Sequence, residues 1–177
     1  MAVSMEQVKE LRERTGAKIV DCKKVLEETG GDMKQALAIL REKGLEVLDK
    51  KAGRETREGR IDVYVHAGNK LAAMVEVNCE TDFVARNDEF VAFVKNLALH
   101  IASNPDVKYI TKDEVPAGEA EAYDAGTPDE YIERSVLLGQ PFVRNPSETI
   151  EAMLRETAAK TGENIVIRRF VRYAVGV

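Results

Sequence analysis

Residues 61–79 read IDVYVHAGNKLAAMVEVNC, and this stretch decides the fold class. Apolar Ile61, Val63 and Val65 alternate with polar or aromatic side chains, which is the period of a half-buried β-strand. Gly68-Asn69 supplies turn residues between two such runs. The alternation then resumes in Ala73, Val75, Val77 and Cys79. We therefore predict a β-hairpin that buries its one apolar face.

The residues before this hairpin have the period of helices. Ser4 with Gln7 is a capping-box signal, and the helix that it begins is predicted to end at Thr15-Gly16. A second helix is predicted from about Ile19 to Gly30, and a third from Asp32 to Gly44. Their expected inward faces carry Ile19, Cys22, Val25 and Leu26, then Met33, Ala36, Leu37 and Leu40. Three short helices separated by glycine predict a compact bundle.

The residues after the hairpin return to the helical period. Apolar side chains recur on one stripe from Asn87 until Pro105, so we predict a long helix that covers the sheet. Asn145-Pro146-Ser147 is predicted to begin a last helix that ends at Gly162. Residues 165–173 are predicted to form a final strand. The fold class is therefore α+β: a three-helix bundle followed by an antiparallel sheet covered by helices.

The remaining segments are predicted to be short or irregular. Residues 46–59 are dense in charge and indicate a linker or a solvated helix. Residues 107–110 are a strand candidate, Thr111 with Glu114 is a capping-box signal, and residues 117–129 are expected to be irregular or poorly ordered. The predicted division is residues 1–45 for the bundle, 46–59 for the linker and 60–177 for the α+β core.

The bulk composition argues against several classes of partner. The chain has 31 acidic and 26 basic residues and a net charge of -5, so the positive field that attracts nucleic acid is missing. Cys22 and Cys79 lack a metal-type spacing, which predicts neither a disulfide framework nor a metal site. Because the sequence has no signal-peptide core and no run of about 18 apolar residues, we expect a cytoplasmic protein without membrane contact.

Residues for covalent catalysis are scarce. The chain has two histidines, His66 near the predicted hairpin turn and His100 late in the covering helix. A nucleophile–histidine system would need a tertiary coincidence that the sequence does not indicate. The glycine-rich nucleotide loops and the hydrolase elbow are absent from the sequence. We therefore expect a protein that acts by binding another protein, without a cofactor and without enzymatic chemistry.

The segment at residues 78–87, NCETDFVARN, is unusual because it carries polar groups where a buried strand turns into a helix. Two interpretations remain open from the residues alone. In the structural one, Thr81 or Asp82 caps a helix and Phe83 belongs to the core. In the functional one, the same residues form an exposed tip that contacts a partner.

Several motifs, in order, resemble those of the elongation factor Ts family, and the resemblance covers nearly the whole chain. Besides residues 78–87, the matching segments are 8–17, 21–24, 140–143, 162–165 and 168–170. The first two resemble the ubiquitin-associated-type domain that begins members of this family. The chain lacks the long helical-hairpin insertion of larger members, so it is similar to the short form. Residues 115–137 look shorter still than in the usual short form.

The resemblance implies a guanine-nucleotide exchange factor that binds elongation factor Tu. On this reading the nucleotide-release tip, Thr81, Asp82, Phe83 and Val84, inserts near the nucleotide site of the partner, where Phe83 disturbs Mg²⁺ and phosphate coordination. Further partner contacts are implied at Arg12, Ile19, Val20, His66 and Gly162. Ile19 is equally consistent with a place in the bundle core. The short form also implies a homodimer, because one core domain offers only part of the binding surface.

A rival from another class is a non-catalytic adaptor or chaperone-like scaffold. Its bundle would recognise a helix, and its second domain would only stabilise the bundle. Such a protein would bind its partner without changing the rate of nucleotide release.

Overall fold

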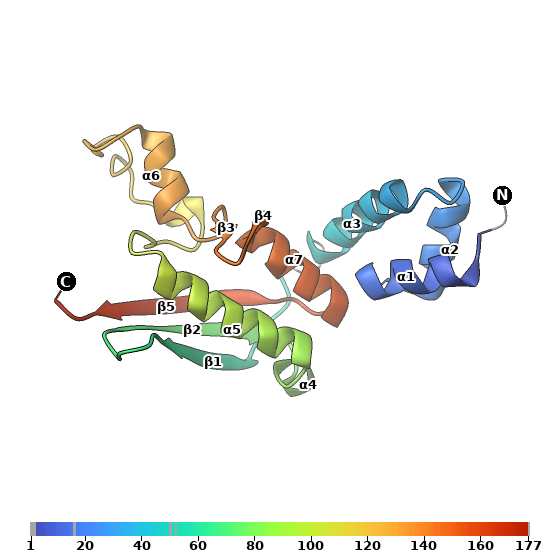
Figure 1. Ribbon diagram of the computed structural model, residues 1–177, viewed down its shortest axis with the longest axis horizontal. Coiled ribbons are helices and arrows are strands. Elements are labelled where there is room, and N and C mark those ends of the chain that lie inside the picture. Colours follow the sequence, from blue (N-terminus) through green and yellow to red (C-terminus); the bar gives the residue numbers. More distant parts are fainter. Residues whose placement is uncertain (1–2, 16, 50, 52, 177) are drawn as a thin grey trace.

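The N-terminal helices form a bundle, as predicted. The computed structural model describes residues 3–15, 17–49, 51 and 53–176, so the predicted stop at Gly16 lies outside the described residues. The helices are α1 (Met5–Thr15), α2 (Ile19–Glu28) and α3 (Met33–Asp49), and Figure 1 shows them at one end of the molecule. Their buried core consists of Val8, Leu11, Cys22, Val25, Leu26, Ala36, Leu37 and Leu40.

Local capping determines where the bundle helices begin. The Ser4 hydroxyl accepts a hydrogen bond from the Gln7 amide at 3.1 Å, and the Gln7 side chain accepts one from the Ser4 amide at 3.0 Å. The Asp32 carboxylate accepts from the amide of Gln35 at the start of α3. The capping box at Ser4 and Gln7 is therefore confirmed, and the predicted start of the third helix at Asp32 is confirmed as well, because each cap satisfies amides that have no partner inside the helix.

Two details of the bundle differ from the prediction. The third helix does not end at Gly44 but continues to Asp49. Glycine inside a helix costs only about 1 kcal/mol, and α3 gains packing against α7 (Ile150–Thr161) in the core domain. Ile19 does not join the buried face of α2, because its side chain is exposed.

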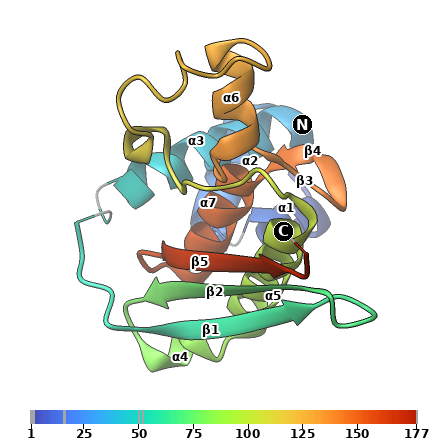
Figure 2. The same ribbon diagram turned by 90° about the vertical axis from the view of Figure 1, so that its left-hand side faces the viewer.

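The second part of the chain is a three-stranded antiparallel sheet with helices on one face. Its strands are β1 (Glu58–Val65), β2 (Leu71–Cys79) and β5 (Val166–Ala174), in the order β1-β2-β5 (Figure 2). The long helix α5 (Asp88–Ser103) packs on β1 and β2, and α7 packs on α5. The core includes Ala73, Val75, Val77, Cys79, Phe90, Val94, Leu97, Ile101, Leu137, Ile150 and Ile167. The α+β prediction is therefore confirmed.

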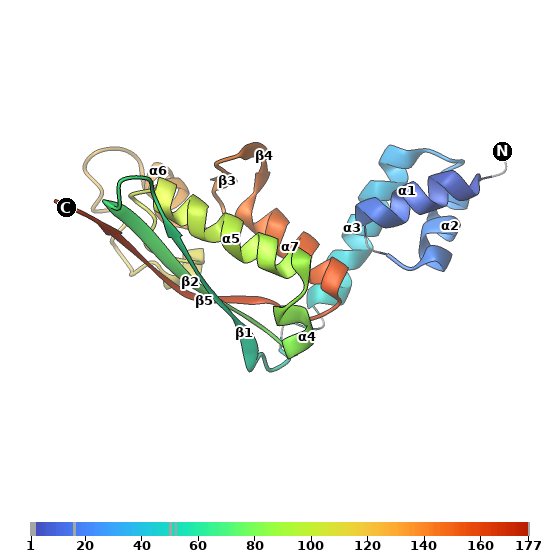
Figure 3. The ribbon, with the colours of Figure 1, turned by 60° about the horizontal axis from the view of Figure 1, so that its bottom comes forward.

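The buried face of the hairpin was predicted wrongly on its first strand. Ile61, Val63 and Val65 are 57%, 52% and 52% exposed. Val75 of the buried row pairs with Asp62 in the register, so the opposite set of β1 side chains faces the helices. The apolar set lies on the outer face of the sheet, and Figure 3 shows α5 on the opposite face. Alternation shows which residues share a face of a strand but not which face is covered.

The start of the last helix also differs from the prediction. Residues Asn145–Thr149 form strand β4, which pairs with β3 (Pro141–Phe142). The helix α7 begins at Ile150, where the Thr149 hydroxyl accepts from the Ala152 amide at 3.2 Å. It ends at Gly162, as predicted, with the left-handed φ of 75° that glycine tolerates.

The segment between α5 and β3 contains one helix that sequence reasoning missed. α6 (Pro128–Ser135) begins with a complete capping box between Thr127 and Glu130, after a run of turns. The predicted capping box at Thr111 does not form. Glu114, at the end of the short 3-10 helix η1 (Lys112–Glu114), accepts from the Ile110 amide instead. The strand predicted at residues 107–110 is reduced to one bridge between Tyr109 and Val136.

Candidate partner-binding tip

The segment that was singled out in the sequence forms an exposed turn at the end of β2. Asp82–Ala85 make one short helix, α4, and the Thr81 hydroxyl caps it by accepting from the Val84 amide at 3.4 Å. Phe83 is 81% exposed, whereas Val84 is buried in the core. The interpretation with Thr81 as a cap is confirmed, and the interpretation with Phe83 in the core is wrong.

The tip is anchored at its far end as well. The Asn87 side chain accepts from the Glu89 amide at 2.9 Å and caps α5. Asp82 is not a cap but pairs with Arg86 at 2.8 Å, one turn later. A four-residue helix has no stability of its own, so these anchors, together with buried Val84, hold it in place. Phe83 is therefore an exposed aromatic ring on a fixed turn.

Glu163, which the sequence analysis did not select, reaches the tip from the other end of the chain. One oxygen of its carboxylate, Oε2, accepts from the amides of Glu80 and Thr81, both at 3.0 Å. The other, Oε1, accepts from the Thr81 hydroxyl at 2.6 Å. The resemblance placed residues 162–165 among the family motifs, but only Gly162 was taken as a contact. The motif therefore pointed to the segment that contains Glu163. It did not indicate that Glu163 binds Glu80 and Thr81.

The Glu80 carboxylate links the same two segments in the opposite direction. Glu80 accepts from the amide of Asn164 at 2.7 Å, and its other oxygen lies 3.4 Å from the Arg54 guanidinium. The hydrogen bond from Asn164 lowers the pKa of the Glu80 carboxyl, and Arg54 adds to that effect. The Asn164 side-chain amide donates to the Arg54 carbonyl at 2.9 Å. The end of the predicted linker is therefore docked at the base of the tip.

The bundle residues expected to touch a partner lie on its surface. Arg12, Ile19 and Val20 are exposed, and Val20 is 75% exposed. Met5 is a further exposed apolar side chain of the bundle. These residues belong to a different part of the molecule from the tip (Figure 1). The exposed apolar side chains of the bundle are therefore separate from Phe83 at the tip.

The two remaining predicted contacts lie at opposite ends of the sheet. His66 follows β1, where its Nδ1 lies 3.0 Å from the Tyr64 hydroxyl. The strand ladder between the Val65–Ala72 and Glu58–Cys79 pairs separates it from the tip by roughly 24 Å, at about 3.4 Å per residue. Gly162 lies next to Glu163 and so belongs to the base of the tip. The structure therefore brings Gly162 to the tip but not His66.

His100, the other histidine, has a structural environment. Its Nε2 lies 2.9 Å from Gln140 Oε1, and the Val143 amide donates to its Nδ1 at 3.3 Å. Burial lowers the pKa of this histidine, so the neutral ring is favoured. It ties α5 to the motif at residues 140–143. Burial likewise raises the pKa of the Cys79 thiol to about 11, so Cys79 is a poor nucleophile.

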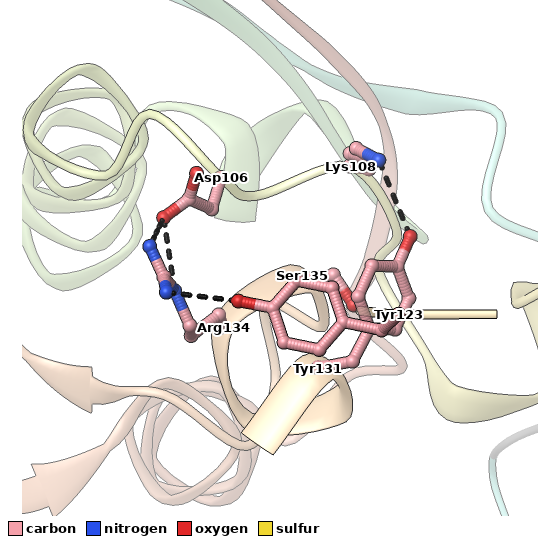
Figure 4. Close-up of a pocket in the computed structure, with 6 residues that line it drawn as sticks. All are labelled: Asp106, Lys108, Tyr123, Tyr131, Arg134 and Ser135. Carbon is pink, nitrogen blue, oxygen red and sulfur yellow. Dashed lines mark hydrogen bonds and ion pairs between the residues drawn. The ribbon is translucent and has the colours of Figure 1, made fainter. Parts of the chain in front are cut away.

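A small hollow of about 170 Å³ lies beside α6, and the residues that line it include none of the predicted site residues (Figure 4). Arg134 lies between Asp106, at 2.6 Å, and the Tyr123 hydroxyl, at 3.1 Å. Lys108 donates to the Tyr131 hydroxyl at 3.2 Å. The Arg134–Asp106 and Lys108–Tyr131 interactions therefore join α6 to the segment after α5. These bonds give the turns before α6 a defined conformation.

Within the described ranges, no three acidic, cysteine or histidine side chains gather as a metal site would require. In that same part of the chain, no helix combines the length and the hydropathy needed to cross a membrane.

The comparisons with known proteins agree with the motifs. Residues 2–125 match the family model described as elongation factor TS. Three proteins named elongation factor Ts are similar to this chain over nearly their full length. The one from Herpetosiphon aurantiacus is 50% identical over 99% of each chain. That of Thermoanaerobacter sp. is 48% identical over 98% of this chain and 95% of its own, and that of Geobacter sulfurreducens is 45% identical over 99% and 91%. The chain belongs to the elongation factor Ts family.

Proposed function

We propose that this protein is a guanine-nucleotide exchange factor that binds elongation factor Tu and speeds the release of GDP. The observation that carries the proposal is the 81% exposure of Phe83 on an anchored turn. A rigidly held aromatic ring makes a good interface anchor, because it offers a large contact area and loses little conformational entropy when it binds. Asp82 beside it adds a carboxylate, so the tip offers one apolar and one charged group to a partner.

The mechanism follows from how a GTPase holds its nucleotide. GDP is held through Mg²⁺, backbone amides and a lysine, all of which require exact distances. A ring that wedges between the side chains near this site displaces those groups, and a small displacement loses charge-assisted hydrogen bonds. Binding linkage is reciprocal, so GDP weakens the binding of the exchange factor by the same factor. No covalent step is required of the protein.

Stopped-flow release of a fluorescent GDP from elongation factor Tu tests this function. With the protein at a tenth of the GTPase concentration and unlabelled GDP in excess, we expect every labelled nucleotide to leave faster than its spontaneous rate. An adaptor would bind the GTPase, as seen by titration, and leave the release rate unchanged. That second outcome would establish the scaffold function instead.

The exposed residues of the bundle are proposed as a second contact with the GTPase. Val20 and Ile19 offer apolar area at the start of α2, with Arg12 nearby in the sequence. We expect Val20→Asp to weaken the affinity for elongation factor Tu by about tenfold, or about 1.4 kcal/mol, without a change in thermal stability. Titration calorimetry measures the affinity.

The matched control is Val175→Asp, since Val175 is 73% exposed and follows β5 at the other end of the molecule. Equal affinities for both variants and the wild type would exclude the bundle contact.

We further propose that two copies of the chain pair through the outer face of the sheet. In the register, Val63 lies beside Met74, and Met74 beside Val171. Val65, Ala72 and Tyr173 form the next row. Glu76 and Arg169 pair at 2.7 Å on the same face, so the face includes no large net charge. An apolar and charge-balanced sheet face is able to stack on a second copy of itself about a twofold axis.

Light scattering tests this pairing. At micromolar concentration we expect twice the 19.7 kDa mass of the chain. Val63→Lys is expected to give the monomer mass, since pairing would bury an unpaired ammonium. Val143→Lys, at an exposed valine outside the sheet, is the control and keeps the dimer mass. A wild-type protein with the monomer mass would contradict the proposal.

A further inference from the structure

We propose that Glu163 is a positioning residue for nucleotide exchange, whose carboxylate fixes the orientation in which Phe83 is presented. This inference rests on the proposed exchange function. Glu163 is 80 residues away from Phe83 in the sequence and does not belong to the tip. Its three hydrogen bonds to Glu80 and Thr81 link the α7–β5 connection directly to the turn.

The connection from Glu163 to Phe83 runs through Thr81. Because the Thr81 hydroxyl donates its hydrogen to Glu163 Oε1, its lone pairs are turned toward the Val84 amide. That amide lies at the start of α4 and has no partner inside so short a helix. The direction of α4, and with it the direction of the Phe83 side chain, therefore depends on where Glu163 holds Thr81.

The chemistry of the site requires a carboxylate. Two backbone amides converge on Glu163 Oε2 while a hydroxyl donates to Oε1, so both oxygens act only as acceptors. A glutamine in this position would keep one acceptor and place an amide N–H₂ against donors. Charge-assisted bonds of this kind are stronger than neutral ones, so Glu163→Gln removes more than one ordinary hydrogen bond.

The position of Glu163 is itself fixed from two sides. Gly162 ends α7 in the left-handed conformation, which sets the direction of the chain at residue 163. Directly after it, the Asn164 amide donates to Glu80. Each segment therefore supplies a carboxylate to an amide of the other: Glu163 accepts from the amide of Glu80, and Glu80 accepts from the amide of Asn164. This reciprocal arrangement prevents the tip and the α7–β5 connection from moving separately.

The test is stopped-flow GDP release catalysed by Glu163→Gln, at a temperature where circular dichroism shows every variant folded. We expect the maximal release rate to fall about tenfold, equal to about 1.4 kcal/mol, while the half-saturating concentration changes little. Thr81→Val, which removes the hydroxyl link, should have a similar effect, and Thr81→Ser, which keeps the hydroxyl, should release GDP faster than Thr81→Val. The matched control is Glu156→Gln, since Glu156 lies on α7 and pairs with Lys160 away from the tip.

A double mutant separates positioning from a general effect on folding. In the Phe83→Ala background, Glu163→Gln should cause no further loss of exchange, because the ring that it orients is gone. An equal loss in both backgrounds, or a wild-type rate for Glu163→Gln alone, overturns the proposal. If the wild type itself does not speed GDP release, the exchange function fails instead. In that case amide hydrogen–deuterium exchange at Val84 tests the inference. We expect the Val84 amide to exchange its hydrogen faster in Glu163→Gln than in the wild type, and an unchanged rate would overturn the inference.

Discussion

Phe83→Ala lowers the catalysed rate of GDP release by about tenfold or more, which is a loss of about 1.4 kcal/mol of coupling between the protein and the bound nucleotide. The physical reason is that alanine leaves no ring to displace the groups around Mg²⁺ and phosphate. Because Phe83 is 81% exposed, replacing its ring removes few contacts from the folded state. We therefore expect a melting temperature close to that of the wild type.

Stopped-flow fluorescence and thermal unfolding are both needed to check this result. Asp82→Ala is the companion variant, because Asp82 shares the tip and its pair with Arg86 is exposed. Exposed pairs of this kind contribute under about 1 kcal/mol to folding, so exchange should fall with little loss of stability. A Phe83→Ala protein that is destabilised but exchanges GDP at the wild-type rate would show that the ring is structural.

Phe90→Ala has the opposite signature, with a loss of about 3 to 5 kcal/mol in the free energy of unfolding. Phe90 lies seven positions after Phe83, on α5, and is fully buried in the core of the second domain. Its removal leaves a cavity among packed side chains that cannot collapse completely. Urea unfolding followed by circular dichroism measures the loss.

The exchange rate per folded molecule should stay near the wild-type value for Phe90→Ala at low temperature. Phe90→Leu is the control, since leucine fills most of the space and should lose less stability than alanine. If Phe90→Ala abolished exchange while unfolding at the wild-type urea concentration, the division between a functional ring and a core ring would be wrong. The two substitutions thus make the same chemical change with opposite expected effects.

Several starts and stops of helices were predictable because they depend on neighbours in the sequence. Ser4 and Asp32 cap the helices that follow them, and Gly162 ends α7. Each of these features satisfies its hydrogen bonds within a few residues, or adopts a backbone conformation that its own residue type allows. The capping box at Thr127 and Glu130 was missed although its signal is equally local. The acidic, glycine-containing composition around it obscured the pattern.

The alternation along residues 61–79 predicted a hairpin correctly and its buried face wrongly. Strand period is a property of the backbone, so it is written in the sequence of any one strand. Which face is covered depends on the side on which α5 packs. The direction of the connection from the hairpin to α5 sets that side, and the alternation within the strands does not reveal it. The apolar row of Ile61, Val63 and Val65 therefore faces outward.

The tip combines both kinds of information. The residue types at positions 78–87 identified the segment, and Thr81 acts as the cap that its sequence favours. The exposure of Phe83 could not be decided there, because a phenylalanine in a short helix fits a core as well as a surface. The tertiary structure decided it by burying Val84 and by bringing Glu163 to Thr81 across 82 residues of chain. Local hydrogen bonds are written in neighbouring residues, whereas contacts between distant segments exist only after the sheet and its helices have packed.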